Sequence, residues 1–542
     1  MSLVQVTDLT VEFGDLRAVD GLSFTLAQGA ALALVGESGS GKSTVASALL
    51  GLHRGTGARV RGSVEVAGVD VQQASDDELG RLRGAKAAMV FQDPLSSLDP
   101  YYAIGDQIAE VYRVHTRVSR RTARARAVEV LDRVGIPDAV RRSRSRPHEF
   151  SGGMRQRALI AMALACEPGL LIADEPTTAL DVTVQAQILD LLHTLRQETG
   201  MGLLLVTHDV GVAAESVDDV LVMRHGRAVE HGPVDAVLGA PAQAYTRELL
   251  AAVPRVDAPR APSGAAGDVV LEAKGLRREF GRGKKTFAAV DDVSLTVHRG
   301  ETLGVVGESG SGKTTLGRML VGLLEPTAGE VRHDGHTRVG VNPAVQMVFQ
   351  DPVSSLNPRR SVGESIADPL RARGMGVPPL ERSREWGRDE QRIRGRVREL
   401  LERVGLEGAH YDRYPHEFSG GQRQRVGIAR ALAADPRVIV CDEPVSALDV
   451  TTQAQVVALL GELQRELGLA LVFVAHDLAV VRQVSDRVAV MRRGRIVEQG
   501  PADEVYDSPR DPYTKQLLAA VPALDPRIAA RRRAERRTVA VS

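Results

Sequence analysis

One order of short motifs occurs twice in this chain of 542 residues. The first copies begin or centre on Gly36 (GESGSGKS), Gln92 (FQDP), Ser151 (SGG), Asp174 and Glu175 (DEP), and His208 (HD). The second copies follow roughly 260–270 residues later, at Gly307, Gln350, Ser419, Asp442 with Glu443, and His476. A period of this length is far longer than a solenoid repeat, which is roughly 20–50 residues. The sequence therefore predicts duplication of a whole domain.

The segment between the two copies is PRVDAPRAPSGAAGD, and its Pro, Ala and Gly content predicts a flexible linker. We expect a first domain at residues 1–253, the linker at 254–268, a second domain at 269–526 and a basic, flexible tail at 527–542. A charged insertion at 374–396 is either a solvated helix or a partner contact. The tail is either frayed or in weak contact with lipid phosphate or RNA.

The overall composition is that of a soluble globular protein, with 43% hydrophobic residues, 25% charged residues and a formal net charge of +0. Two cysteines, Cys166 and Cys441, exclude a disulfide framework and a cysteine-built metal cluster. The first residues, MSLVQVTDLT, do not resemble a signal peptide. No apolar run approaches the ~18 residues of a membrane span, so action at a membrane would require a partner.

Short apolar segments precede most of the motifs. ALALV stands before the first glycine-rich loop, LLIA and VIVC stand before the two DEP motifs, and LLLV and LVFV stand before the two histidines. Helical patterns separate these segments, and strands that alternate with helices form parallel sheets covered on both faces. Each half is therefore predicted to be an α/β domain with a mainly parallel sheet.

The GxxxxGK[ST] pattern follows a strand and precedes a helix in both halves, which is the context of a phosphate-binding P-loop. Its glycines let backbone N–H groups close around phosphates, and the helix N-terminus adds positive potential. Lys42 and Lys313 should reach the β- and γ-phosphates, and the hydroxyls of Ser43 and Thr314 should ligate Mg²⁺. The predicted phosphate-binding set is Gly36, Ser38, Gly39, Gly41, Lys42, Ser43, Thr44, Gly307, Ser309, Gly310, Gly312, Lys313, Thr314 and Thr315.

The DEP motifs place two carboxylates at the end of an apolar strand. Asp174 and Asp442 are suited to holding the Mg²⁺ shell through water. Glu175 and Glu443 are suited to polarising an attacking water, because phosphoryl transfer requires positioning more than covalent chemistry. A lone histidine after a buried strand is more often structural, but His208 and His476 recur in register. We therefore predict that both histidines sense the γ-phosphate.

Taken together, the motifs resemble the nucleotide-binding domain of ATP-binding cassette (ABC) proteins, twice over nearly the whole chain. The resemblance implies a helical subdomain in each half, which carries the SGG loop. It also implies that Gln92 and Gln350 contact the nucleotide and Mg²⁺, and that Asp181 and Asp449 couple two nucleotide sites.

The SGG loop stands before a helical run, so it predicts an anion site at a helix N-terminus. In the resembling family this loop caps the γ-phosphate of ATP held by the opposite domain. One chain could thus build two composite sites. The first would combine Lys42 with Ser419, Gly420 and Gly421, and the second would combine Lys313 with Ser151, Gly152 and Gly153. Since neither copy lacks a motif residue, we expect both sites to hydrolyse ATP.

Family members usually stack an aromatic ring on the adenine. Phe13 is the candidate in the first half and Phe280 in the second, with Phe287 as a rival; ordinary packing in a strand is the alternative. Some relatives also carry a cysteine-rich segment that binds an iron–sulfur cluster. This chain has no cysteine after its YT…LLAAVP endings, so we expect no such cluster.

Three pairs of segments resemble the two ATPase subunits of peptide and nickel importers. They are the sequences around the two SGG loops, the segments FQDPLSSLDP and FQDPVSSLNP, and the endings AYTRELLAAVP and PYTKQLLAAVP. The resemblance implies two membrane permeases that dock near residues 93–100 and 351–358, an extracytoplasmic binding protein, and a peripheral location on the cytoplasmic face of the membrane. An exporter ATPase remains open, as does a soluble ABC ATPase acting on ribosomes or DNA. The short linker and the lack of zinc-binding cysteines disfavour this soluble class, so no nucleic-acid partner is expected. The cargo stays open.

Overall fold

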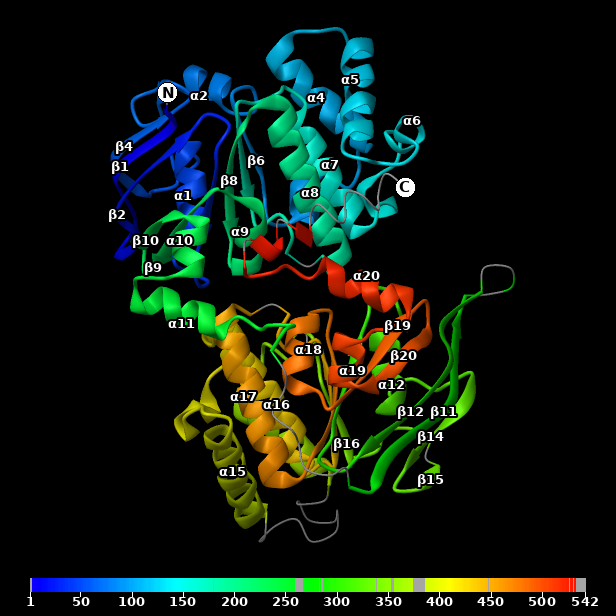
Figure 1. Ribbon diagram of the computed structural model, residues 1–542. Helices are drawn as coiled ribbons and strands as arrows, with labels where there is room; N and C mark the ends of the chain where they lie inside the picture. The colour runs from blue at the N-terminus through cyan, green and yellow to red at the C-terminus, as the bar shows by residue number, and fades with distance from the viewer. Residues whose placement is uncertain are drawn as a thin grey trace. The chain divides into compact units, whose positions relative to one another are not determined.

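The computed structural model describes residues 2–178, 180–258, 267–281, 283, 286–337, 339–351, 355–373, 386–446, 448–525, 527–529 and 531–532. Most of the predicted linker, the first part of the charged insertion and most of the predicted tail lie outside these ranges. The chain forms two units, Met1–Val253 with Pro522–Ser542, and Pro254–Val521 (Figure 1). The boundaries drawn from the sequence stay predictions, and each unit is described separately.

The first unit is built on a six-stranded sheet with the order β10-β9-β3-β8-β7-β6. Neighbouring strands from β6 to β9 are parallel, and only β10 runs antiparallel to β9. The mainly parallel sheet expected from the sequence is confirmed. The strands are β3 (Ala31–Val35), β6 (Ala87–Val90), β7 (Leu170–Asp174), β8 (Gly202–Thr207), β9 (Asp219–Arg224) and β10 (Arg227–Pro233).

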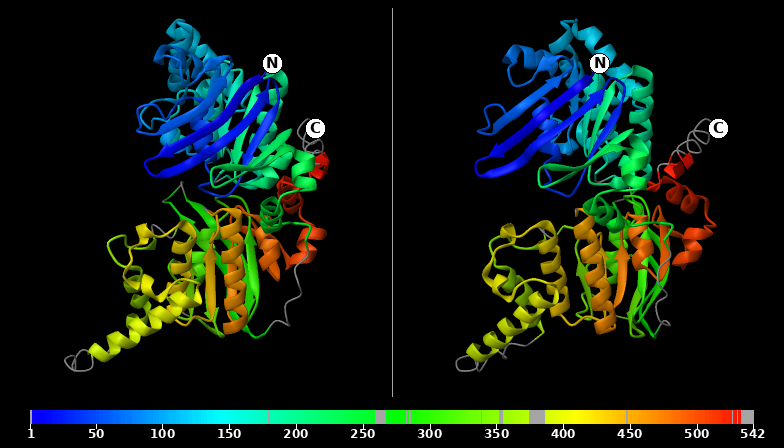
Figure 2. Two further views of the ribbon diagram at one scale, coloured as in Figure 1. Left: turned by 90° about the vertical axis from the view of Figure 1, so that its left-hand side faces the viewer. Right: turned by 60° about the vertical axis from the view of Figure 1, so that its left-hand side comes forward.

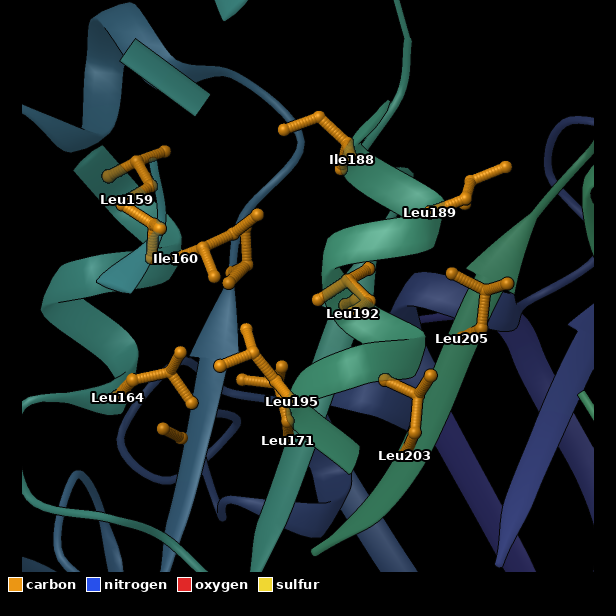
Figure 3. Packing of buried hydrophobic residues seen from close by; sticks show 14 of the residues in the cluster. Leu159, Ile160, Leu164, Leu171, Ile188, Leu189, Leu192, Leu195, Leu203 and Leu205 are labelled. Carbon is orange, nitrogen blue, oxygen red and sulfur yellow. The ribbon is translucent and has the colours of Figure 1, made fainter. Parts of the chain in front are cut away.

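The two faces of this sheet serve two separate cores, because side chains alternate along a strand. Leu32 and Leu34 of β3 pack with helix α1 (Lys42–Leu49) and with a second, antiparallel sheet. Ala31, Ala33 and Val35 face the opposite core. Figure 3 shows this opposite core, where labelled leucines of α7 (Gly152–Leu164), α8 (Val182–Thr199), β7 and β8 gather between the helices and the sheet.

The antiparallel sheet has four strands in the order β2-β1-β4-β5, and no sequence motif predicted it as a separate layer. Its strands β1 and β2 are twelve residues long and alternate between buried and exposed positions. The four strands are β1 (Ser2–Phe13), β2 (Leu16–Ala27), β4 (Arg59–Val66) and β5 (Val69–Asp70).

A group of helices between β6 and β7 forms the helical subdomain of the first unit, as the resemblance implied. It comprises α3 (Pro94–Ser97), α4 (Ile104–Thr116), α5 (Arg120–Arg133), α6 (Ala139–Arg142), the short η1 (Pro147–Glu149) and α7. The remaining helices of the first unit are α2 (Asp76–Leu82), α9 (Val210–Ser216), α10 (Val234–Gly239) and α11 (Ala244–Ala252).

The second unit repeats this plan. Its mainly parallel sheet has the order β16-β17-β18-β13-β19-β20, and its antiparallel sheet has the order β12-β11-β14-β15. The strands are β11 (Val269–Phe280), β12 (Phe287–His298), β13 (Thr302–Val306), β14 (Ala328–His333), β15 (His336–Thr337), β16 (Val345–Val348), β17 (Val438–Asp442), β18 (Ala470–Val474), β19 (Arg487–Arg492) and β20 (Arg495–Pro501).

Helix α15 of the second unit, drawn in yellow in Figure 2, projects from the rest of that unit; it begins within the charged insertion and continues beyond it. The helices are α12 (Lys313–Leu320), α14 (Val362–Ala372), α15 (Trp386–Arg403), η3 (Gly408–Asp412), η4 (Pro415–Glu417), α16 (Gly420–Ala433), α17 (Val450–Leu467), α18 (Leu478–Val484), α19 (Ala502–Asp507) and α20 (Pro512–Ala520). No helix among the described residues is long and apolar enough to cross a membrane.

Candidate nucleotide sites

Each glycine-rich loop connects a central parallel strand to a helix, as the motif requires. Gly41 has a φ of 97° and directly precedes α1; a Cβ atom there would lie 2.3 Å from the carbonyl oxygen of Ala18. Gly312 has a φ of 104° and would place a Cβ atom 2.2 Å from the carbonyl oxygen of Ala289. Both positions therefore require glycine for backbone conformation and for space.

The P-loop lysines are held over their own loops. Lys42 is only 5% exposed, and its Nζ donates to the carbonyl oxygens of Gly36 at 2.7 Å and Glu37 at 2.8 Å. Lys313 is equally buried and donates to Gly307 at 2.7 Å and Glu308 at 2.9 Å. These bonds fix a compact positive charge beside the helix N-terminus, where phosphates would bind.

A hydroxyl and a carboxylate meet at the start of each P-loop helix. Ser43 Oγ donates to Asp174 Oδ1 at 3.0 Å, and Thr314 Oγ1 donates to Asp442 Oδ1 at 3.1 Å. Both carboxylates are buried; burial raises the pKa of Asp174 to about 6 and also raises that of Asp442. Hydroxyl and carboxylate oxygens are the ligands that Mg²⁺ prefers, so both pairs fit this ion.

Glu175 is the centre of a convergent set of polar side chains. Its carboxylate accepts hydrogen bonds from Gln92 Nε2 at 2.7 Å and Thr178 Oγ1 at 2.9 Å, and lies 3.1 Å from His208 Nδ1. Its backbone N–H donates to the carbonyl oxygen of Val206 at 2.8 Å. The predicted glutamine, glutamate and histidine are thus brought together at the ends of three neighbouring strands. Sequence reasoning missed Thr178, whose only signal was a hydroxyl three residues after the glutamate.

The second unit repeats this arrangement around Glu443. Gln350 Nε2 donates to its carboxylate at 2.8 Å, and His476 Nδ1 lies 3.3 Å from it. Ser446, three residues further on, donates instead to the backbone oxygen of Glu443 at 3.2 Å. Glu175 and Glu443 have φ values of 47° and 46°. These values lie in the left-handed region of backbone conformation, which is uncommon for residues other than glycine, asparagine and aspartate. Such backbone strain concentrates at functional sites.

The glutamate and histidine of each site stabilise one another's charge. Burial alone would raise the pKa of Glu175, but the hydrogen bond and charge of His208 outweigh it and lower that pKa. Burial would lower the pKa of His208, and Glu175 reverses this, so the histidine pKa is raised. Glu443 and His476 show the same opposed shifts. Each pair therefore favours a carboxylate beside an imidazolium.

The SGG loops begin the helices α7 and α16. Ser151 Oγ accepts from the N–H of Met154 at 3.3 Å, and Ser419 Oγ accepts from the N–H of Gln422 at 3.3 Å. The serine and the first glycine, Gly152 or Gly420, are exposed in both loops. The second glycine packs closely: a Cβ atom on Gly153 would lie 2.4 Å from Val184, and one on Gly421 would lie 2.3 Å from Thr452. Asp181 and Asp449 stand at the N-caps of the neighbouring helices α8 and α17.

The aromatic candidates lie at the end of the first strand of each antiparallel sheet. Phe13 is 38% exposed, and its ring contacts His53 edge-on at 5.4 Å. Phe280 pairs across the hairpin with Phe287, with ring centroids 6.0 Å apart, and the guanidinium of Arg278 lies 5.0 Å from the centroid of Phe280. Phe280 thus occupies the place of Phe13, whereas the counterpart of Phe287 is Leu16.

Two P-loops with matched hydroxyl–carboxylate pairs and Gln–Glu–His groups define a tandem P-loop ATPase. Residues 19–178 and 290–446 both match the ABC transporter family. The chain belongs to this family, and it is an ATP-binding protein and an ATPase. The resemblance and the fold expected from the sequence are confirmed. Residues 229–276 and 497–541 match a second family, the C-terminal region of oligopeptide/dipeptide transporters.

Curated relatives match this chain along almost its full length. The glutathione import ATP-binding protein GsiA of Salmonella choleraesuis is 46% identical over 574 residues, covering 97% of this chain and 90% of that protein. GsiA of Escherichia coli (strain K12) is 47% identical over 558 residues, covering 94% and 87%. A solved structure of CbiO1 from Clostridium perfringens, part of an ABC transporter complex, is 30% identical and covers 48% of this chain and 98% of that chain, with a TM-score of 0.39.

Proposed function

We propose that the chain is the complete ATPase of an importer for peptides or related small solutes, with both ATPase subunits fused in one polypeptide. The observation that carries this proposal is the presence, in both halves, of an ABC cassette followed by the C-terminal region of oligopeptide/dipeptide transporters. The relatives whose names specify glutathione import support a peptide-like cargo. A role on ribosomes or DNA is not favoured, because the segments after both cassettes match the C-terminal region of oligopeptide/dipeptide transporters.

The proposed reaction is hydrolysis of ATP at each P-loop. Lys42 or Lys313 binds the β- and γ-phosphates together with the backbone N–H groups of its loop. Mg²⁺, held by the Ser43–Asp174 or Thr314–Asp442 pair with Gln92 or Gln350, would neutralise charge on the phosphate oxygens. The remaining groups in this proposed phosphate cradle are Gly36, Ser38, Gly39, Gly41, Thr44, Gly307, Ser309, Gly310, Gly312 and Thr315.

Glu175 and Glu443 orient the attacking water in this proposal. Each carboxylate is held by a glutamine and a histidine, so its oxygens need not reorganise when water donates a hydrogen bond to them. The imidazolium of His208 or His476 then donates to the γ-phosphate, where negative charge shifts during phosphoryl transfer. The P–O bond to the β-phosphate breaks as water forms the new bond, and ADP and phosphate are the products.

We further propose that each ATP binds between two cassettes. The exposed serine and first glycine of each SGG loop, at the N-terminus of a helix, provide N–H donors for the γ-phosphate held by the other P-loop. Asp181 and Asp449 would link the two sites across this pairing. Shifting the two cassettes from 1:99 to 99:1 in favour of the proposed ATP-bound pairing takes ~5.5 kcal/mol of differential binding. Two γ-phosphates, each with several charge-assisted hydrogen bonds, can supply this amount.

The proposed partners are two permeases and an extracytoplasmic binding protein, with the chain on the cytoplasmic face of the membrane. Apolar side chains support a docking surface after Gln92: Leu95 is 60% exposed and Tyr101 is 81% exposed. In the second unit, a cavity of about 450 Å³ is lined by Met347, Phe349, Pro369 and further residues at the junction of sheet and helical subdomain. Residues 352–354 of the predicted docking segment lie outside the described ranges.

Affinity purification of the tagged chain from native membranes in mild detergent tests the proposal, with partners identified by mass spectrometry. Two different polytopic permeases in equal amounts are the expected result. Recovery of ribosomal proteins or DNA instead, with no permease, would contradict it. A Lys42→Ala/Lys313→Ala double variant should recover the same permeases and serves as the control for nucleotide-independent docking.

A further inference from the structure

A tyrosine from the C-terminal region of the second unit contacts its P-loop directly. Tyr513, in the first turn of α20, is 2% exposed. Its Oη accepts a hydrogen bond of 3.1 Å from the backbone N–H of Glu308, the residue after the first P-loop glycine. Burial raises the pKa of Tyr513 to about 12, and the neighbouring Glu308 carboxylate, which also hydrogen-bonds the phenol, adds to this shift. The phenol is therefore neutral and can both accept from and donate to Glu308.

The peptide group that donates to Tyr513 also holds the P-loop lysine. The N–H of Glu308 and the C=O of Gly307 belong to one peptide bond, and that C=O accepts from Lys313 Nζ at 2.7 Å. Hydrogen bonds in such a series polarise one another and strengthen both contacts. The phenol thus fixes the orientation of the peptide plane on which the lysine rests.

Tyr513 itself is firmly anchored. The carboxylate of Glu498 in β20 accepts from the N–H groups of Arg510 at 2.8 Å and Asp511 at 3.1 Å, just before α20. Asp511 caps the helix by accepting from the N–H of Tyr513 at 2.8 Å. The guanidinium of Arg492 lies 4.6 Å from the centroid of the tyrosine ring. A side chain held at its backbone and at its ring can fix the position of the P-loop peptide that it contacts.

The first unit repeats this framework around Tyr245, in the first turn of α11. The guanidinium of Arg224 lies 4.5 Å from its ring centroid, and the tyrosine is 7% exposed. Glu230 accepts from the N–H groups of Ala242 at 2.8 Å and Gln243 at 3.2 Å, as Glu498 does in the second unit. The P-loop residue that corresponds to Glu308 is Glu37. Both tyrosines lie within the segments that match the oligopeptide/dipeptide transporter C-terminal region.

We propose that Tyr513 is a positioning residue for ATP binding: its phenol fixes the P-loop peptide between Gly307 and Glu308 and so aligns the lysine for the phosphates. The inference rests on the proposed role of Lys313 in phosphate binding. The C-terminal region is then part of the nucleotide site, and a change in the position of α20 would alter ATP affinity.

The test uses the full chain with Lys42→Ala, so that only the second P-loop binds nucleotide. Tyr513→Phe keeps the ring and its contact with Arg492 but removes the hydroxyl. Affinity for a fluorescent ATP analogue with Mg²⁺ should fall roughly 3- to 10-fold, the effect of one or two hydrogen bonds. Tyr411→Phe is the matched control, because it removes a buried hydroxyl that bonds a glutamate, Glu364, at 3.0 Å in the helical subdomain. It should leave the affinity unchanged.

A double-mutant cycle separates positioning from packing. Glu308→Ala keeps the backbone N–H but removes the carboxylate, so its effect on affinity should be smaller when Tyr513 is already Phe. Unchanged affinity in Tyr513→Phe would overturn the proposed positioning role. Lys313→Ala in the same background should abolish binding. If Lys313→Ala still binds nucleotide, both the proposed nucleotide site and the positioning role of Tyr513 are wrong. If Lys313→Ala loses binding but Tyr513→Phe has normal affinity, only the positioning role of Tyr513 is wrong.

Discussion

Gln92 and Glu175, which are far apart in the sequence, form a hydrogen bond of 2.7 Å from the glutamine amide to the glutamate carboxylate. Gln92 directly precedes the exposed segment that we propose as a permease docking surface, whereas Glu175 directly follows the buried strand β7. A displacement of the exposed segment would therefore reach the carboxylate through a single side chain. The same connection recurs between Gln350 and Glu443 at 2.8 Å.

Replacement of either glutamate by glutamine should reduce steady-state ATP hydrolysis. Because both Gln–Glu–His groups are complete, we expect Glu175→Gln and Glu443→Gln each to lose at least about half of the turnover. The loss can exceed half because the effects of mutations on residues that act as a unit do not add. The measurement is phosphate release at saturating ATP, with ATP binding retained as the control. Full turnover in either single variant would mean that its site is idle.

The two glycines of an SGG loop should respond differently to alanine. A Cβ atom on Gly153 would meet Val184 at 2.4 Å, so Gly153→Ala should lower the free energy of unfolding by about 1–3 kcal/mol. A Cβ atom on Gly152 would meet Leu180 at an ordinary 3.7 Å, so Gly152→Ala should keep or raise stability while ATP hydrolysis falls. Thermal unfolding and phosphate release check both. Normal hydrolysis in Gly152→Ala would argue against a phosphate contact at this loop.

Adenine stacking should depend on Phe13 and Phe280. Loss of a ring stacked on a base costs about 1–3 kcal/mol, so alanine at either position should weaken ATP binding at the P-loop of its own unit. Phe287→Leu is the control, because the first unit carries Leu16 at the matching hairpin position. ATP titrations with the other P-loop lysine changed to alanine would show this. An effect of Phe287→Leu equal to that of Phe280→Ala would instead assign the stack to Phe287.

Acid should weaken the helical subdomain of the second unit through Glu364. The hydrogen bond from Arg371 lowers the pKa of Glu364, with further contributions from Tyr411 and Arg360. A lowered folded pKa contributes stability that is present above the unfolded pKa and is lost as pH falls through the folded value. Glu364→Gln should therefore lower the melting temperature at pH 7, and the difference from wild type should shrink toward pH 4. A difference that is constant with pH would rule out this charge effect.

The sequence predicted the central sheet and most candidate site residues because P-loops and carboxylates occur at fixed positions relative to buried strands. It did not predict the antiparallel sheet as a separate layer. Strands such as Ser2–Phe13 alternate between buried and exposed side chains like any half-buried strand, and no local sequence feature identifies the strands with which they pair. It also missed Thr178 and Tyr513. The contact of Tyr513 with Glu308 joins residues about 200 positions apart, which no local periodicity can reveal.

Each proposed composite site combines the P-loop of one cassette with the SGG loop of the other. Nucleotide retained per chain tests this most directly, in a Glu175→Gln/Glu443→Gln background that binds ATP without hydrolysing it. Lys42→Ala with Ser419→Arg should damage a single composite site and leave one retained ATP, whereas Lys42→Ala with Ser151→Arg should damage both sites and leave none. The reverse pattern would contradict the claim, because each SGG loop would then serve the P-loop of its own cassette.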